Sequence, residues 1–238
     1  TRRFYLYAVS GTRLYLKYDA APNISINDYS FHRLTFDSRS YFELSYTGKV
    51  SFAARFYGGT SWGDDARKFA LGGTPWVASS DIDLISDDYE NNLGEHYYMN
   101  NFVYPIRGHE LGQRYGNHAL LMNFEFRLPM LVYYFPTIKY LGQIFGVFFV
   151  DMGVAWDDHF PAYNDRDSWC NPKKTNSSGL GTYDECDGMT TGWIMSYGFG
   201  PRFIFFNMPW KLDYAWEYDP NLGKISDKKW YLSVGLDF

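Results

Sequence analysis

The sequence predicts an all-β protein, and within that class an antiparallel transmembrane β-barrel. Three observations support this prediction. Apolar and polar residues alternate with a period of two in many segments, which is typical of β-strands with two different faces. The connections between these segments alternate between short and long. The third observation is the aromatic fraction of 21%, which is more aromatic surface than one soluble core of 238 residues readily buries.

Composition excludes several other classes of protein. No segment approaches the ~20 consecutive apolar residues that a membrane-spanning helix needs. The formal net charge of −5 argues against nucleic acid as a partner, because nucleic-acid binders usually carry a basic patch. The chain opens at Thr1 without a signal segment, so either a signal has been removed or the chain is part of a longer polypeptide.

The alternation is clearest near the C-terminus, where Trp230, Leu232 and Val234 share one face and Tyr231 and Ser233 share the other. In the strong strands the apolar face is rich in large aromatic side chains, and the opposite face is polar, charged or glycine. About nine strands are expected, over residues 2–9, 13–20, 31–45, 50–57, 120–131, 144–156, 193–205, 211–218 and 229–238.

A soluble β-sandwich shows the same alternation and is the alternative fold. The polar face favours a barrel, because charges such as Glu125 and Arg127 beside small residues suit a water-filled lumen. Aromatic residues also gather at strand ends, as in the interfacial girdles of outer-membrane barrels. Short turns such as 46–49 alternate with long loops at about 61–118 and 157–191, as in a transmembrane barrel.

The expected strand number does not close a bacterial barrel, because single-chain barrels of this kind have an even number of strands. Unpaired strand edges in lipid are costly, so some strands are missing from the chain, miscounted, or supplied by another chain. The absence of a start residue favours the first explanation.

Several short motifs occur in one order along the chain. They are FALGG at 69–73, IRGH at 106–109, NFEFRLP at 123–129, FVDMGVAW at 149–156, SYGFGPR at 196–202, LDYA at 212–215 and GLDF at 235–238. This ordered set resembles the C-terminal half of the BamA/TamA-type barrels, the bacterial surface-antigen family of outer-membrane assembly and translocation proteins. The resemblance covers about residues 30–238.

The resemblance implies a barrel of sixteen strands, of which residues 1–238 hold the last nine or so, as its C-terminal part. It also implies that residues 61–118 form a long loop folded into the lumen and that residues 157–191 form a long extracellular loop. The sequence departs from the family in two places. The loop carries an acidic insert between Gly73 and Ile106, and His109 stands where the family usually has an aromatic residue.

Arg107 is the centre of a predicted loop anchor, because its planar guanidinium can bind carboxylates through two donors at once. Glu125 and Asp151 are expected to point inward from adjacent strands and to reach this one cation, with Phe149 packing on the guanidinium. The resemblance supports this assignment, since the family makes a contact between the loop tip and the inner wall. Gly108 is expected to allow a tight turn at the tip. The alternative is that these charges pair with other neighbours.

The C-terminal strand is expected to have two roles. Phe238, with Trp230 and other apolar residues at alternate positions before it, resembles the signal that outer-membrane substrates present to the assembly machinery. The alternative is a final lipid-facing strand with no such role. In the family this strand also forms a weak seam with the first strand, and Gly235 would weaken pairing there. A seam that opens could template an incoming strand.

Cys170 and Cys186 lie together in the polar loop at 157–191. A disulfide formed in an oxidising compartment is the favoured interpretation, and free or metal-binding thiols are the alternative. The acidic residues of the same loop lack the spacing of a known calcium loop, so a solvated loop is favoured and no metal is expected.

No enzyme motif is present, so we expect neither an enzyme nor a cofactor. The resemblance implies a protein of the bacterial outer membrane that inserts or translocates other proteins through a BamA-like barrel. The implied partners are the lipid bilayer, client outer-membrane or secreted proteins, and periplasmic or lipoprotein subunits. A non-catalytic structural or pore barrel within a larger outer-membrane complex is the alternative.

Overall fold

The structure is a computed structural model, and it describes residues 8, 10–21, 30–45, 50–75, 77–79, 101–103, 105–109, 112–129, 144–158, 160, 174–175, 182–183, 193–206, 208–218 and 228–235. Among these residues no helix is long and apolar enough to cross a membrane. Several predictions fall outside the described residues. They concern Phe238, Cys170, Cys186 and the first expected strand at 2–9, of which only Ala8 is described.

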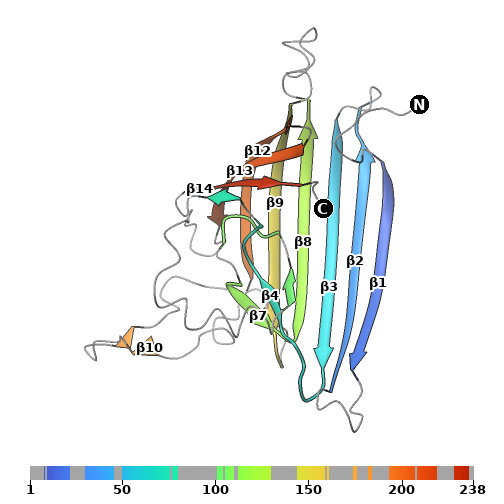
Figure 1. Ribbon diagram of the computed structural model, residues 1–238, viewed down its shortest axis with the longest axis vertical. Helices are drawn as coiled ribbons and strands as arrows, with labels where there is room; N and C mark the ends of the chain where they lie inside the picture. Colours follow the sequence, from blue (N-terminus) through green and yellow to red (C-terminus); the bar gives the residue numbers. More distant parts are fainter. Residues whose placement is uncertain are drawn as a thin grey trace.

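Eight long strands form one antiparallel sheet in the order β1-β2-β3-β8-β9-β12-β13-β14 (Figure 1). Their bounds are Gly11–Ala21 (β1), Phe31–Glu43 (β2), Ser51–Trp62 (β3), His118–Leu128 (β8), Phe145–Trp156 (β9), Ile194–Phe205 (β12), Met208–Tyr218 (β13) and Lys229–Val234 (β14). A two-residue strand, β5 (Ala78–Ser79), extends the sheet beyond β14. The all-β, antiparallel barrel fold is therefore confirmed, and eight of the nine expected strands lie where the alternation predicts them.

The described sheet is not closed into a complete barrel. Within the described residues its two ends are β1 and β5, and no strand joins them. Figure 1 shows the sheet twisting along its width, so that β12, β13 and β14 cross the direction of β3 and β8 at a steep angle. This twist turns the inner faces of β9, β12 and β13 toward the loop that connects β3 to β8.

The two faces of the strands differ in the way that the alternation predicts. In β8 every second residue is buried, and these residues include Asn123, Glu125 and Arg127. On the opposite face the large side chains are exposed, and Phe148 and Phe199 are 50% and 43% accessible. Their rings lie next to each other with centroids 6.3 Å apart across β9 and β12. An exposed, continuous aromatic face on a sheet of this size is typical of contact with lipid.

The loop between β3 and β8 packs against the inner face of the sheet. It contains a small three-stranded sheet in the order β6-β4-β7, with bounds Asn101–Val103 (β6), Phe69–Leu71 (β4) and Arg114–Gly116 (β7). One buried apolar cluster joins loop residues to the inner faces of β8, β9 and β12, and its members are Phe69, Leu71, Val103, Ile106, Ala119, Leu121, Ala155 and Ile194. The inner face is therefore apolar under this part of the loop.

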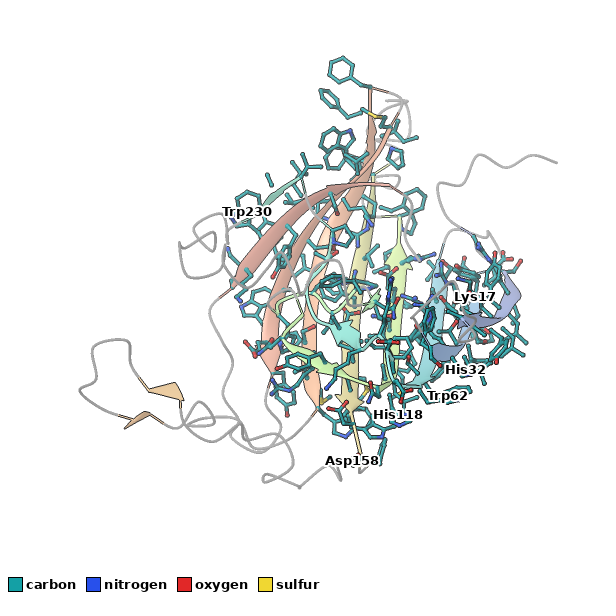
Figure 2. The ribbon with its side chains drawn as sticks, turned by 60° about the horizontal axis from the view of Figure 1, so that its bottom comes forward. Lys17, His32, Trp62, His118, Asp158 and Trp230 are labelled. Atoms are coloured by element: carbon teal, nitrogen blue, oxygen red, sulfur yellow. The ribbon has the colours of Figure 1, made fainter. Side chains whose placement is uncertain are left out.

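Aromatic and histidine side chains line the end of the sheet near the long connections. The rings of His32 and Trp62 stack with centroids 5.6 Å apart, and those of His118 and Trp156 with centroids 5.4 Å apart. Figure 2 shows His32, Trp62 and His118 gathered at this one end. Rings with both apolar and polar edges suit the boundary between lipid and water.

The remaining described strands are short. The pair β10 (Lys174–Thr175) and β11 (Thr182–Tyr183) forms a separate two-stranded sheet in the connection between β9 and β12.

Candidate functional site

Two adjacent strands bring the predicted carboxylates to one place. In the ladder between β8 and β9, Asn123 pairs with Asp151 and Glu125 pairs with Phe149. Side chains two residues apart share a face of a strand, so all four side chains point to the inside of the sheet. Glu125 and Asp151 are both fully buried. Two carboxylates in such a place need a cation, because an uncompensated buried charge is strongly destabilising.

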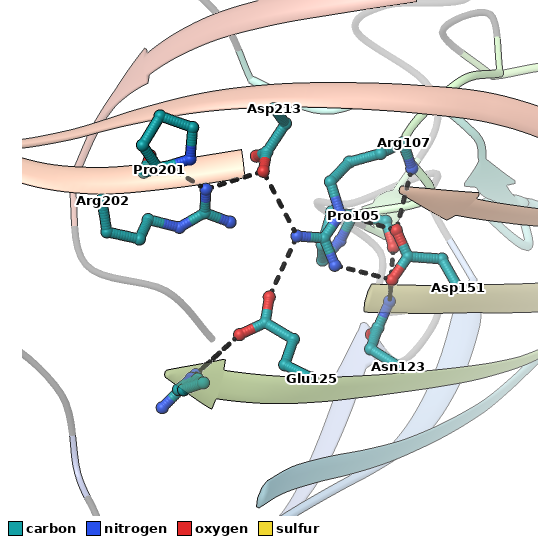
Figure 3. Close-up of polar contacts among 9 residues, drawn as sticks. Pro105, Arg107, Asn123, Glu125, Asp151, Pro201, Arg202 and Asp213 are labelled. Atoms are coloured by element: carbon teal, nitrogen blue, oxygen red, sulfur yellow. Dashed lines mark hydrogen bonds and ion pairs between the residues drawn. The ribbon is translucent and has the colours of Figure 1, made fainter. Parts of the chain in front are cut away.

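Arg107, at the tip of the loop, supplies this cation (Figure 3). Its Nε and Nη2 atoms donate to the two oxygens of Asp151 at 2.7 and 2.8 Å. Its Nη1 atom donates to Glu125 Oε1 at 2.9 Å, and its backbone N–H donates to Asp151 Oδ2 at 3.1 Å. The structure thus brings together the three charged residues that the sequence placed in the anchor.

The guanidinium of Arg107 also rests on an aromatic ring. Its Cζ atom lies 3.6 Å from the centroid of the Phe149 ring, which is a close cation–π contact. The ring has room because its ladder partner on β12 is Gly198. A Cβ atom at position 198 would overlap the Phe149 ring and the carbonyl oxygen of Tyr214.

The two residues after Arg107 reach farther along the inner wall. Gly108 has a φ of +90°, a backbone conformation that glycine adopts without strain. His109 is buried, and its Nε2 atom lies 2.8 Å from the carbonyl oxygen of Met195. Its Nδ1 atom lies 2.8 Å from Gln113 Oε1 and 3.2 Å from Glu217 Oε1. The loop tip is therefore bound to β12 and β13 as well as to β8 and β9.

The ionic cluster is larger than the sequence prediction. Arg127 Nη2 lies 2.8 Å from Glu125 Oε2, and Arg202 Nη1 lies 2.7 Å from Asp213 Oδ1. Asp213 also lies 3.9 Å from Arg107 Nη1. With Asp151, the cluster holds three guanidinium groups and three carboxylates, all buried. Its formal charges cancel, which is the condition for keeping so many ions away from water.

Asn123 is a further member of the cluster that the sequence prediction did not include. Its Nδ2 atom donates to Asp151 Oδ1 at 2.8 Å and to the carbonyl oxygen of Pro105 at 2.7 Å. It therefore fixes Asp151 on the wall and the loop backbone two residues before Arg107. Its place in the cluster could have been predicted from the sequence, because Asn123 lies two residues before Glu125 on the same face of the strand.

Burial and the neighbouring carboxylates act in opposite directions on Arg107. Burial opposes the charged form, but the charges and hydrogen bonds of Asp151 and the charges of Glu125 and Asp213 outweigh it. Together they raise the pKa of the Arg107 guanidinium well above its usual value. The Arg107 guanidinium therefore keeps its positive charge at neutral pH.

The comparison with known families decides the identity of this fold. The Omp85 superfamily domain matches the chain over residues 1–238. The chain belongs to the Omp85 superfamily. This confirms the BamA/TamA-type resemblance that the ordered motifs indicate.

Among solved structures, this Omp85 domain matches BamA from Haemophilus ducreyi, in a crystal structure that lacks POTRA domains 1–3. The TM-score is 0.53 and the sequence identity is 14%. The match covers 98% of this chain and 40% of the BamA chain, so the Omp85 domain spans less than half of that relative. At this identity the likeness shows the fold, which is that of an outer-membrane β-barrel.

The other predicted residues of the Omp85 domain lie apart from the anchor. Trp230 lies in β14 and pairs with Tyr214 of β13. Gly235 follows the end of β14 with a φ of +132°, and its N–H donates to the carbonyl oxygen of Pro209 at 2.9 Å. The proposed roles of these residues in a seam stay predictions.

Proposed function

We propose that this Omp85 domain is part of an outer-membrane barrel that inserts other β-rich proteins into the bacterial outer membrane or translocates proteins across it. Membership of the superfamily supports this role in general terms. The observation that carries the proposal is the Arg107 anchor. It holds a loop of the chain on the inner wall beside the C-terminal strands, where a client chain would be handled.

The proposed partners follow from the surfaces of the domain. The exposed aromatic face would contact the lipid bilayer of the outer membrane, and client outer-membrane or secreted proteins would meet the barrel at the edges of the sheet. Periplasmic or lipoprotein subunits would complete the machinery. We propose no nucleotide and no cofactor, because strand pairing and burial in lipid release the free energy that a client needs for insertion.

A structural barrel within a larger outer-membrane complex is the alternative function. Phe69, Leu71 and Ile106 of the loop are buried against the inner wall. This apolar packing fills part of the interior, so it disfavours an open pore. A structural barrel could keep the same anchor and the same fold without acting on clients.

The test is client assembly by the full-length protein in lipid vesicles, with Arg107→Ala as the variant. Removing one partner of a buried ion pair costs about 3–5 kcal/mol, because the remaining charges are left unpaired. We expect loop cleavage by added protease to accelerate and the yield of assembled, protease-resistant client to fall.

The matched control is Lys68→Ala, in the same loop. Lys68 forms an ion pair with Asp157 at 2.7 Å, and both side chains are about two-fifths exposed (38% and 42%). Exposed pairs contribute about 0–1 kcal/mol, so this variant should assemble clients as the parent does. Undiminished assembly by Arg107→Ala, with the loop shown to be released, would contradict a role for the anchor. A parent protein that assembles no client would favour the structural barrel.

A further inference from the structure

The loop between β3 and β8 contacts the inner wall at a second place, on strands that Arg107 does not reach. Arg33 of β2 lies opposite Asp19 of β1 in the ladder. Its Nε and Nη2 atoms donate to Asp19 Oδ2 at 3.1 and 2.7 Å, and its Nη1 atom donates to Oδ1 of Asn101. Asn101 is the first residue of β6 in the loop, so Arg33 joins the loop to β1 and β2.

Asn101 is bound to the rest of the loop as well as to the wall. Its backbone N–H donates to the carbonyl oxygen of Lys68 at 2.8 Å, and its Nδ2 atom lies 3.4 Å from the carbonyl oxygen of Arg67. Phe69 pairs with Asn101 in the ladder between β4 and β6. A side chain that holds Asn101 therefore also positions β4, the central strand of the small loop sheet.

The Arg33 contact and the Arg107 anchor use different strands of the wall. Arg33 and Asp19 belong to β2 and β1. Glu125 and Asp151 belong to β8 and β9, and β3 lies between the two pairs of strands (Figure 1). Within the part of the chain that the structure describes, the hydrogen-bond partners of the two arginines have no residue in common. Loss of one contact thus removes no direct partner of the other.

The two contacts also differ in their exposure to water. The Arg33 and Asp19 side chains are 18% and 26% exposed, whereas those of Arg107 and Glu125 are 3% and 0% exposed. Lys17, a second partner of Asp19 at 3.0 Å, is 64% exposed. Salt screens ion pairs that water reaches and affects buried pairs much less. The Arg33 contact should therefore be sensitive to salt, and the Arg107 anchor should not.

We propose that Arg33 is a second anchor of the loop, which holds β6 against β1 and β2 independently of Arg107. Arg33 is a positioning residue in this arrangement, because Asp19 orients its guanidinium and its Nη1 atom fixes Asn101. The two anchors lie at the two ends of residues 101–107, so either end of this span can leave the wall while the other stays. The proposal concerns the loop itself and holds whether or not the protein inserts clients.

Amide hydrogen exchange in the full-length protein, reconstituted in lipid vesicles, tests the two ends separately. The Asn101 amide reports the end near Arg33, and the Ile106 amide reports the end near Arg107, and both donate to backbone carbonyls of the loop. A backbone amide exchanges when its hydrogen bond opens, so its protection measures how firmly that end is held. Fragmentation of the labelled peptides in a mass spectrometer resolves the two amides.

Each single variant should release one end only. Arg33→Ala should accelerate exchange at Asn101 by about ten-fold or more, because hydrogen bonds to charged groups are among the stronger ones, and should leave Ile106 unchanged. Arg107→Ala should have the reverse effect, and the double variant should accelerate both amides. If Arg107→Ala releases Asn101 as strongly as Ile106, the loop has a single anchor and the proposal is overturned.

Two variants control for other charges nearby. Lys17→Ala removes the exposed partner of Asp19, and Lys68→Ala removes an exposed ion pair of the loop. Both should leave exchange at Asn101 at the parental rate, because the Arg33 guanidinium still binds this residue. A loss of protection in either control equal to that in Arg33→Ala would overturn the assignment of Arg33.

Salt dependence gives a readout that a general loss of stability would not produce. Raising sodium chloride from about 0.01 M to about 1 M shortens the screening length from about 30 Å to about 3 Å. In the parent this change should lower protection at Asn101 several-fold and leave Ile106 unchanged. Arg33→Ala should lose the salt effect at Asn101, and Lys68→Ala should keep it. A salt effect of parental size in Arg33→Ala would overturn the proposal.

Variants of Asn101 test the same contact from the side of the loop and leave the wall unchanged, should Arg33→Ala not fold. Asn101→Ala removes the acceptor for Arg33 but keeps the backbone N–H, so the exchange measurement still applies after correction for the intrinsic rate of the new residue. We expect faster exchange at position 101 and no change at Ile106. Asn101→Asp keeps an acceptor and should restore the protection. Equal protection in the two variants would overturn the role of Arg33.

Discussion

At the scale of single residues, the anchor shows how a membrane barrel keeps charges inside itself. Arg107 is bound by two carboxylates, and each of these has a further partner, Arg127 for Glu125 and Asn123 for Asp151. No member of this set could be removed without leaving a buried charge or donor unsatisfied. Such a cluster holds the loop in one position mainly through the cost of breaking it.

Holding the loop on the inner wall should require the geometry of the Arg107 side chain and not only its charge. Arg107→Lys keeps the positive charge but loses the planar fork that binds both oxygens of Asp151. We expect the free energy of unfolding to fall by about 1–3 kcal/mol, because acceptors in the cluster are left unsatisfied. The measurement is the protease sensitivity of the loop, which should lie between those of the parent and Arg107→Ala. A lysine variant as resistant as the parent would show that charge alone is sufficient.

His109 should contribute separately from Arg107, since its two ring nitrogens bond to β12 and to Gln113 of the loop. In His109→Leu both hydrogen bonds are lost, and the carbonyl oxygen of Met195 loses this donor. This change should lower the free energy of unfolding by about 1–3 kcal/mol. His109→Gln is the control, because its amide N–H can still donate. The readout is the urea midpoint of the reconstituted protein, and equal midpoints for both variants would contradict this role.

At the scale of strands, small residues on the inner wall make room for the loop and its partners. A Cβ at Gly153 would lie 2.6 Å from Ile106, and a Cβ at Gly200 would lie 2.8 Å from the Asp213 carboxylate. Both distances are too short for a side chain to be accepted without movement. Gly153, Gly198 and Gly200 are therefore part of the site, because each leaves room for a larger side chain of the anchor region.

Gly198 gives the sharpest test of this arrangement. In Gly198→Ala the new methyl group would overlap the Phe149 ring and a backbone carbonyl. This overpacking should destabilise the folded protein by about 1–3 kcal/mol or more. Gly58→Ala is the control, because its Cβ would meet only Leu120 at 3.4 Å. Folding yield in detergent and loop protease sensitivity should both change in the first variant and stay at parental values in the second. The same response in both variants would mean that the packing of Phe149 does not depend on glycine at position 198.

At the scale of the whole molecule, the two faces of the sheet meet different solvents. The inner face carries the ionic cluster and the loop, and the outer face exposes rings such as Phe148 and Phe199. This division predicts the orientation of the sheet in a bilayer, with the rings in lipid. It also explains the high aromatic content, since these rings need no protein core to cover them.

A charge placed on the outer face should reveal its contact with lipid. Phe148→Lys should cost about 2–4 kcal/mol near the middle of a bilayer, because lysine has no aqueous partner there. Phe148→Leu is the control and should fold as the parent does. Folding into vesicles followed by urea titration measures the difference. A lysine variant as stable as the leucine variant would place this face in water or against protein.

Some features of the anchor can be predicted from the sequence, and others cannot. Glu125 and Asp151 were assigned to the anchor because a strand pleat is local, so the alternation alone predicts which side chains point inward. The roles of Arg202 and Asp213 were not assigned, because they depend on how far the sheet twists between β9 and β13. β5 was not predicted either, since two residues carry no periodic signal.

The long strands of the sheet, their two faces and the residues available for the anchor could be predicted from the amino-acid sequence, because they follow from short-range alternation and from the chemistry of single side chains. Three features could be seen only in the tertiary structure: part of the inner wall beneath the loop is apolar, six buried charges form one neutral cluster, and a short strand of the loop pairs with the last strand. These features join residues far apart in the chain, and their positions depend on the twist of the whole sheet and the path of the loop across it.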